Sequence, residues 1–224
     1  MTDTPFSANE RFYERASVVD HYSVIEELLP AESRVLSRWS ARLAGADLLD
    51  LGVGAGRTVK ALTALCGRYT GIDYSAAMID RCRARHPGAR LYRCHFQDMS
   101  LFADASFGAI CGLFNPLADV GHEDRLAALG EIARVLARGG YFIFSAHNLD
   151  AADTPDDDGA GHAVVVEQMH GTDLPTYYIT REAQAAQLAG AGFEVLEVSD
   201  GDGNPLTDPE KSRDRWLYYV AIRR

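Results

Sequence analysis

Short apolar runs alternate with longer amphipathic segments through the middle of the chain. The short runs are typical of buried strands, and the segments between them, where apolar residues recur every three to four positions, are typical of helices. The expected order is strand 48–51, helix 57–66, strand 69–73, helix 75–86, strand 90–95, strand 107–114, helix 122–137 and strand 141–145. This alternation predicts parallel strands joined by right-handed crossovers, with helices on both faces of the sheet.

Residues 6–44 precede the first predicted strand and also carry helical spacing. Pro30 divides them into two predicted helices. The first part is rich in aromatic residues, among them Tyr13 and Tyr22. It could fold over a ligand as a lid, or its aromatic side chains could simply pack on the sheet.

The last third of the chain departs from the alternation. Residues 150–161 are acidic and contain Gly and Pro, which predicts a solvated loop. The pattern after this loop predicts a hairpin, a helix capped by Thr180, and two final strands that pair antiparallel. These elements are expected at 164–166 and 177–179 for the hairpin, 180–191 for the helix, and 193–198 and 216–222 for the strands.

The first predicted strand runs directly into three glycines, Gly52, Gly54 and Gly56. Without Cβ atoms, the backbone there can adopt positive φ and let a ligand approach it closely. The first amides of the following helix lack intrahelical partners and carry the positive end of the helix dipole. The sequence therefore predicts a turn that binds an anionic group.

The spacing of the turn discriminates between anions. A dinucleotide-binding turn has the spacing G-x-G-x-x-G, and a phosphate-binding loop ends in Gly-Lys-Ser/Thr. Here the spacing is G-x-G-x-G, and Arg57 stands where the third glycine would fall. Asp50, two residues before the first glycine, would repel a pyrophosphate and attract an ammonium group. A ligand with both an amine and a carboxylate, such as an amino-acid moiety, fits these residues better.

Charge and composition exclude several classes of partner. The formal net charge of −10 argues against nucleic acid, whose binding needs clustered Lys and Arg. No apolar run approaches the roughly 18 to 20 residues of a membrane span, and the first residues lack the basic and apolar regions of a signal peptide. We therefore expect a soluble, cytoplasmic protein. The four cysteines form no C-x-x-C pair, so we expect no metal site.

Three motifs in this order resemble those of the class I S-adenosylmethionine-dependent methyltransferases. They are the glycine turn at 48–58, the segment 71–75 that ends the second strand, and the run from 114–125 to the R-V-L-x-x-G-G ending at 134–140. The resemblance implies an α/β, doubly wound, Rossmann-like methyltransferase fold with an N-terminal helical lid. Its mostly parallel, seven-stranded sheet would have the order 3-2-1-4-5-7-6 with the last strand antiparallel, in agreement with the pattern at the end of the chain.

The same resemblance implies S-adenosylmethionine as cofactor and S-adenosylhomocysteine as its product. Asp50 would hold the amino group of the cofactor, the backbone of Gly52 and Gly54 would lie under its methionine moiety, and Arg57 would stand near its carboxylate. Asp73 would accept hydrogen bonds from both ribose hydroxyls, as a carboxylate with two oxygens can. The alternative role for Asp73 is a helix cap or a surface acid.

The adenine contacts follow the family only in part. Residues that would surround the adenine and the other side of the cofactor are Tyr74, Met78, Leu113 and Phe114. After the third strand, however, the family's Gly-Asp-(small or Met) is replaced by Cys94-His95-Phe96. His95 or backbone could accept from the adenine amino group, or Asp98 could reach in from three residues further on. Phe96 can still stack on the adenine and donate its amide.

We expect one domain in four parts, since 224 residues can bury a single core. The parts are a helical lid at 1–44, a cofactor-binding core at 45–147, an acidic loop and hairpin insertion at 148–180, and a C-terminal helix with the last two strands at 181–224.

Methyl transfer chiefly requires that the acceptor be aligned and water excluded. If the acceptor is a hydroxyl, phenol or protonated amine, a base helps, and histidine is the usual one. His147, past the fifth strand, and His122, past the fourth, are the candidates, although His122 could equally be the polar start of a helix. Candidate acceptor contacts are Tyr13, Tyr22, Asn115, Asp119, Asn148 and Tyr177, of which the tyrosines could equally be ordinary packing.

The sequence thus predicts a methyltransferase that moves a methyl group to nitrogen or oxygen of a small molecule by in-line displacement. We expect no nucleic-acid or membrane partner. The alternatives are methylation of a tRNA base or a protein side chain, a non-catalytic cofactor-binding module, and a dinucleotide-dependent oxidoreductase. The missing third glycine disfavours the oxidoreductase.

Overall fold

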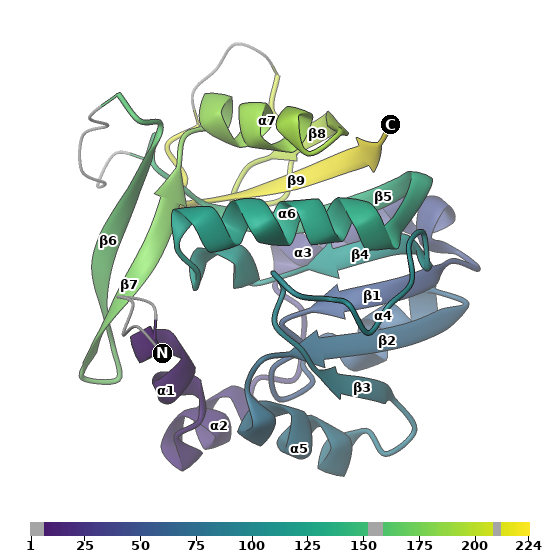
Figure 1. The fold of residues 1–224 in the computed structure, drawn as a ribbon, viewed down its shortest axis with the longest axis vertical. Helices are drawn as coiled ribbons and strands as arrows, with labels where there is room; N and C mark the ends of the chain where they lie inside the picture. Colours follow the sequence, from purple (N-terminus) through teal and green to yellow (C-terminus); the bar gives the residue numbers. More distant parts are fainter. Residues whose placement is uncertain (1–6, 152–158, 208–211) are drawn as a thin grey trace.

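The computed structural model describes residues 7–151, 159–207 and 212–224. They form one sheet with helices on both faces (Figure 1). The strands are β1 Asp47–Leu51, β2 Arg68–Asp73, β3 Arg90–Arg93, β4 Phe107–Gly112, β5 Leu136–Asn148, β6 His162–Met169, β7 Thr172–Ile179, β8 Phe193–Ser199 and β9 Trp216–Arg223. The helices are α1 Ser7–Tyr13, α2 Ala16–Ser23, α3 Pro30–Leu43, α4 Val59–Leu65, α5 Ala76–Arg85, α6 His122–Val135 and α7 Arg181–Gly190, with the short 3-10 helix η1 Pro116–Ala118 after β4.

The main sheet has the order β3-β2-β1-β4-β5-β9-β8. The first five of these strands are parallel, and β9 is antiparallel to both β5 and β8. With β8 and β9 as the sixth and seventh strands, this is the expected order 3-2-1-4-5-7-6 with the last strand antiparallel. The predicted fold class is therefore confirmed.

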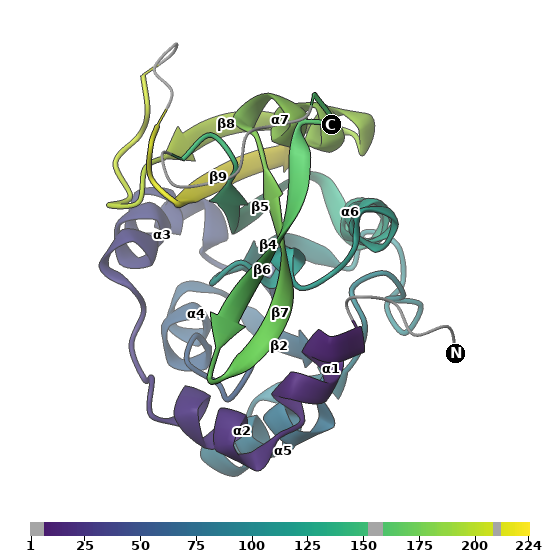
Figure 2. The ribbon, with the colours of Figure 1, turned by 90° about the vertical axis from the view of Figure 1, so that its left-hand side faces the viewer.

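The hairpin β6–β7 makes the sheet fork at the end of β5. The last two residues of β5 pair in parallel with β7, His147 with Tyr178 and Asn148 with Ile179. Earlier residues of β5 pair only with β4 and β9 among the described strands. The hairpin therefore projects past the carboxyl ends of the parallel strands, as Figure 2 shows.

Side chains alternate between two cores along each central strand. In β1, Leu48 packs with α3, α4 and α5, whereas Leu49 and Leu51 pack on the face that carries α6 and α7. In β5, Ile143 belongs to the first core and its neighbour Phe142 to the second. This period of two, with apolar residues on both faces, is why the strands appear in the sequence as short apolar runs.

The structure corrects two predicted boundaries. Pro30 does not divide two helices of a pair but begins α3, where its missing N–H costs nothing, and the residues before it form two short helices. The predicted helix 122–137 ends at Val135, and β5 begins at Leu136 instead of 141. Leu136 pairs with β4, and the register of this pairing then shifts before Tyr141. Gly139, whose φ is +76°, lies in this interval and forms a bulge within the strand.

The N-terminal helices lie over the carboxyl ends of the strands, next to the tip of the hairpin (Figures 1 and 2). The Glu14 carboxylate accepts hydrogen bonds from the Ala76 and Ala77 amides at the start of α5, at 2.7 and 3.3 Å. Asn9 donates to the Pro175 carbonyl of β7 at 3.0 Å. These contacts hold the N-terminal segment against the start of α5 and against β7.

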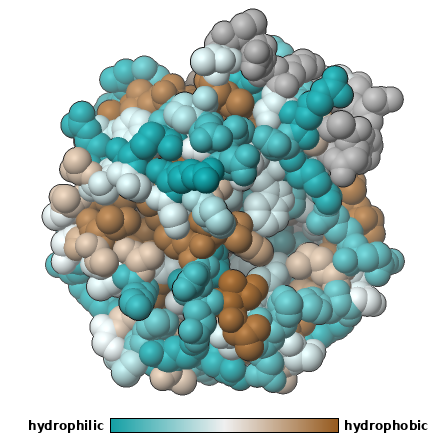
Figure 3. Space-filling model, turned by 180° about the vertical axis from the view of Figure 1, so that it is seen from behind, coloured by the Kyte–Doolittle hydropathy of each residue, from teal (hydrophilic) through white to brown (hydrophobic). Residues whose placement is uncertain are grey.

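No helix in the described ranges combines the length and the apolar character that crossing a bilayer demands. On the face opposite to that of Figure 1, apolar residues occur in small groups among polar ones (Figure 3). Most of the acidic loop predicted at 150–161 lies outside the described residues.

Candidate functional site

A glycine turn connects β1 to α4. Gly52, Gly54 and Gly56 have φ values of +70°, +53° and +98°, a region that residues with a Cβ atom rarely adopt. The Gly52 amide donates to the Ile72 carbonyl at 2.9 Å. The turn therefore folds against the end of β2, and the helix after it begins at Val59, two residues later than the sequence predicted.

Asp73, the last residue of β2, binds this turn through its side chain. Its Oδ2 accepts from the Gly54 amide at 2.9 Å, and its Oδ1 accepts from the Ser75 amide at 2.9 Å. Burial raises the pKa of Asp73 to about 6, although the two amides act to lower it. Each carboxylate oxygen has two lone pairs, so each can accept one further hydrogen bond. The N-cap of α5 is Ser75, so Asp73 is neither that cap nor a surface acid.

Asp50 lies behind the turn and is buried. Its Oδ2 accepts from the Thr58 hydroxyl at 2.5 Å and from the Tyr69 hydroxyl at 2.7 Å. Burial raises its pKa to about 6. The sequence predicted that Asp50 would hold a ligand amine. Its partner Thr58 lines the cleft described next, and Asp50 lies behind Thr58.

The glycine turn, the ends of β2 and β4 and the N-terminal helices enclose a cleft. Its lining includes most of the predicted cofactor contacts, namely Gly52, Gly54, Arg57, Asp73, Tyr74, Met78, Phe96, Leu113 and Phe114. It also includes half of the predicted acceptor contacts, namely Tyr13, Tyr22 and Asp119. The remaining lining residues are Ile25, Val53, Ala55, Thr58 and Pro116.

Arg57 brings a positive charge to the cleft wall. Its guanidinium forms two bonds with the buried Glu32 of α3, at 2.5 and 2.9 Å, and lies 5.0 Å from the centre of the Phe114 ring. A guanidinium has five N–H donors, so Arg57 can still donate to an anion in the cleft. Sequence reasoning missed Glu32, because it lies 25 positions away from Arg57 in the chain and belongs to none of the motifs.

His95 and Asp98 do not line the cleft. The His95 ring stacks on Tyr74, with centroids 5.9 Å apart, and lies 3.6 Å from Glu10 on the outer side. The Asp98 carboxylate is exposed and accepts from the Ser100 amide at 3.2 Å. Of the three residues considered for the adenine edge, only Phe96 lines the cleft.

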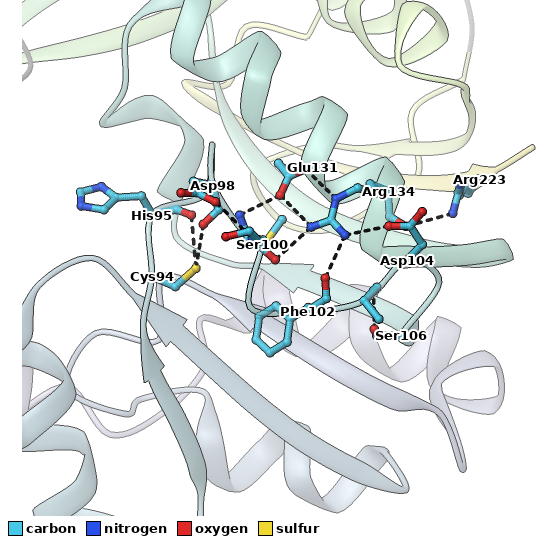
Figure 4. Close-up of polar contacts among 12 residues, drawn as sticks. Cys94, His95, Asp98, Ser100, Phe102, Asp104, Ser106, Glu131, Arg134 and Arg223 are labelled. Carbon is cyan, nitrogen blue, oxygen red and sulfur yellow. Dashed lines mark hydrogen bonds and ion pairs between the residues drawn. The ribbon is translucent and has the colours of Figure 1, made fainter.

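Arg134, from the R-V-L-x-x-G-G motif, holds the segment that follows Asp98 (Figure 4). It donates to both carboxylate oxygens of Glu131 and to the carbonyls of Met99 and Phe102, all at 2.7 to 2.9 Å. It also pairs with Asp104 at 2.8 Å. This arginine of the motif thus fixes the connection between β3 and β4 and is remote from the cleft.

His147, one candidate base, lies outside the cleft lining. Its Nε2 is 3.3 Å from the Asn115 amide nitrogen, and its ring centroid is 5.8 Å from that of Trp216. It lines a separate hollow together with Glu167 and Arg215. Burial lowers the pKa of His147 to about 4, which would make it a weak base.

His122, the other candidate base, begins α6, as its alternative interpretation proposed. Its Nδ1 lies 2.8 Å from the Tyr177 hydroxyl, and its ring stacks on that of His162 at 4.1 Å. Burial lowers the pKa of His122. Neither His122 nor Tyr177 lines the cleft.

The two asparagines predicted as acceptor contacts have backbone roles. The Asn148 side chain is buried and donates to the Ser212 and Asp214 carbonyls at 3.1 and 2.9 Å. Asn115 follows Phe114, and both have positive φ, +58° and +70°. This unusual pair of left-handed residues turns the chain sharply after β4, which brings Phe114 into the cleft lining.

Comparison with known proteins gives one family. Residues 49–144 match the methyltransferase domain family. The chain is 28% identical over 168 residues to a protein of Mycolicibacterium smegmatis named as a probable S-adenosylmethionine-dependent methyltransferase, covering 73% of this chain and 58% of that protein. It is 32% identical over 133 residues to a fatty-acid O-methyltransferase of the same organism, covering 51% and 46%. The chain spans about half the length of these two relatives.

Solved structures share the fold at low sequence identity. The CcbJ methyltransferase from Streptomyces caelestis superposes with a TM-score of 0.71 at 19% identity, covering 95% of this chain and 98% of that one. The glycopeptide N-methyltransferase MtfA in complex with S-adenosylmethionine gives a TM-score of 0.67 at 16% identity, covering 87% and 94%. At these identities the likeness concerns the fold.

We predict that Gly52→Ala destabilises the protein more than Gly54→Ala. Both positions have positive φ, which costs an alanine about 1 to 2 kcal/mol. A Cβ atom on Gly52 would also lie 2.8 Å from the Pro116 Cβ, whereas one on Gly54 would meet no atom within 4 Å. Urea denaturation of the two variants measures the difference. Equal losses would show that Pro116 does not restrict the turn.

We predict a pH-dependent effect of Asp119→Asn on stability. Burial raises the pKa of Asp119 to about 7, so in the wild type the folded state holds this proton more tightly than the unfolded state, where the pKa is 3.8. The wild type therefore loses stability relative to the variant as pH rises from about 4 to about 7, by roughly 1 to 4 kcal/mol. Urea denaturation at pH 4.5 and pH 8 measures the change. The exposed Asp124→Asn is the control, and parallel behaviour of both variants would contradict the prediction.

Proposed function

We propose that this chain is a class I S-adenosylmethionine-dependent methyltransferase and that it transfers the methyl group of S-adenosylmethionine to a nitrogen or oxygen atom of a small molecule. When bound, this cofactor supplies a methyl group on a sulfonium centre, which a nucleophile takes by in-line displacement. The observation that carries the proposal is the pairing of Asp73 with the glycine turn. The Asp73 carboxylate, which can accept hydrogen bonds from two hydroxyls, lies beside the exposed backbone of the glycine turn at the ends of β1 and β2.

The residues of the cleft fit this cofactor. A Cβ atom at Gly54 would meet nothing within 4 Å, so there is open space above the turn for an amino-acid moiety. The free lone pairs of Asp73 suit two ribose hydroxyls, and Arg57 can donate to a carboxylate. Apolar walls suited to adenine are provided by Met78, Phe96 and Leu113. The Tyr74 hydroxyl is buried and has no partner within the described chain, so it is available to a ligand.

The N-terminal helices support the exclusion of water that methyl transfer needs. Tyr13 from α1 and Tyr22 from α2 line the cleft opposite the glycine turn, and Ser75 donates to the Tyr13 carbonyl at 3.0 Å. We propose that residues 1–44 act as the lid, 45–147 as the cofactor-binding core and 148–180 as a hairpin insertion that contacts the lid.

A small acceptor is favoured over a macromolecule. The net charge of −10 disfavours a tRNA substrate, since binding to its phosphates requires clustered positive charge. The names of similar proteins include a fatty-acid O-methyltransferase and a glycopeptide N-methyltransferase, which supports both oxygen and nitrogen as acceptor atoms. A cofactor-binding module without catalysis remains the alternative of another class.

Titration calorimetry tests the proposal directly. The wild type is titrated with S-adenosylmethionine, S-adenosylhomocysteine, NAD and NADP. We expect the first two to bind and the dinucleotides not to bind, because the third glycine of the dinucleotide turn is replaced by Arg57. Binding of NAD with neither sulfur compound would overturn the proposal.

We predict that Asp73→Ala weakens S-adenosylhomocysteine binding by about 1 to 3 kcal/mol, because two ribose hydroxyls lose their acceptor. Calorimetry measures the affinity. The variant also loses the bonds to Gly54 and Ser75, so thermal unfolding must first show that it is folded. Asp80→Ala, on the exposed side of α5, is the control. An unchanged affinity in a folded Asp73→Ala protein would remove Asp73 from the ribose site.

A further inference from the structure

A second carboxylate lies in the cleft, separate from the one assigned to the ribose. Among the described residues that line the cleft, Asp73 and Asp119 are the acids. Asp119 directly follows the 3-10 helix η1, beyond the turn that Phe114 and Asn115 make after β4. Asn9 of α1 donates to its carbonyl at 3.2 Å and fixes its position under the N-terminal helices.

Aromatic rings surround this carboxylate. Tyr13 has its ring centroid 5.7 Å from that of Tyr22 and 6.1 Å from that of Tyr74, and Tyr22 lies 6.4 Å from Phe114. All four rings line the same cleft as Asp119. The Tyr13 side chain lies close enough to Asp119 to affect the pKa of its carboxyl. Aromatic faces next to a carboxylate form a site that favours a cation.

Among the described residues, the protein does not supply that cation. Within the described chain, no Lys or Arg forms an ion pair with Asp119. Arg57, the guanidinium of the cleft, is paired with Glu32. Burial and the nearby Asp73 charge raise the pKa of Asp119 to about 7, while the Tyr13 side chain acts to lower it. The site is therefore an acid poised between its two protonation states and without a counter-ion.

We propose that Asp119 binds the ammonium group of a small amine and takes its proton, so that the acceptor class is an amine. This inference rests on the proposed methyltransferase function and narrows its acceptor from nitrogen or oxygen to nitrogen. Tyr13 and Tyr22, from the N-terminal helices, form the aromatic walls around the bound cation.

The ionised Asp119 accepts a hydrogen bond from the ammonium group and then its proton, which leaves a neutral carboxylic acid and a free nitrogen lone pair. That lone pair forms the new N–C bond, while the C–S bond breaks and its electrons stay on sulfur. The nitrogen takes over the positive charge, and Asp119 releases its proton to water after the product leaves.

Asp119 suits this role better than either histidine. His147 and His122 lie outside the cleft lining, and burial lowers the pKa of each, which weakens it as a base. Asp119 lines the cleft, and an acid that titrates near neutral pH can both hold the proton and release it. The other role open to Asp119 is contact with the cofactor's own amino group, and the experiment below separates the two.

Binding of matched probes tests the proposal without turnover. The wild type is saturated with S-adenosylhomocysteine and titrated with benzylamine, benzyl alcohol and benzoate at pH 8. We expect benzylamine to bind at least tenfold more tightly than the other two. Asp119→Asn and Asp119→Ser should remove this preference, and the exposed Asp124→Asn should keep it. The 13C signal of the Asp119 carboxyl, followed in the wild type, should report a lower pKa when benzylamine is bound.

Three results would overturn the inference. The first is equal binding of benzylamine and benzyl alcohol by the wild type, and the second is an unchanged preference for benzylamine in both Asp119 variants. The third is an equal loss of affinity for S-adenosylhomocysteine and for benzylamine in these variants, which would assign Asp119 to the cofactor's amino group. Failure of the wild type to bind S-adenosylhomocysteine at all would instead contradict the proposed function. The 13C titration of the Asp119 carboxyl needs only the wild type, so it tests the inference even if neither variant folds.

Discussion

The hydrogen bonds from the Gly54 and Ser75 amides to Asp73 are the interaction on which the candidate site depends. They fasten the turn after β1 to the start of α5, so two loops that could move separately become one surface. A glycine turn alone would be flexible, since glycine loses more conformational entropy than other residues on ordering. Buried acceptors shared with backbone amides offset that cost. The open backbone over the turn is thereby held in a fixed position next to a carboxylate.

Charge in the cleft is distributed unevenly. Arg57 is neutralised by the buried Glu32, whereas Asp73 and Asp119 have only hydrogen-bond donors for partners within the described chain. Burial of unpaired carboxylates costs free energy, which appears as their raised pKa values. Such groups are common at functional sites, because a ligand that supplies the missing donors or cation recovers the cost. The arrangement favours hydroxyl groups next to Asp73 and a positive charge next to Asp119.

The part of the cleft wall that carries Tyr13, Tyr22 and Asp119 is built from segments that are distant in the sequence. The N-terminal helices reach across to the hairpin through Asn9, and Asn115 and Phe114 turn the chain after β4. The fork in the sheet at the end of β5 places the hairpin past the strand ends (Figure 2). The residues of this part of the wall are positioned by contacts between separate segments and not by the parallel sheet alone. The cofactor side, in contrast, is formed by β1, β2 and the turns that follow them.

The sequence alone determined the order of strands and helices, the glycine turn and the place of Asp73, because each depends on contiguous residues whose apolar period and backbone requirements are local. It also proposed Tyr13, Tyr22 and Asp119 as acceptor contacts without ranking them above His147, Asn148 or Tyr177. Only the tertiary structure decided which of these side chains line the cleft, since that depends on side-chain direction and on partners far away in the chain. Arg57 and Glu32, 25 positions apart, and Asn9 and Asp119, 110 apart, meet only when helices dock on the sheet. Packing of that kind leaves no periodic signal in the sequence.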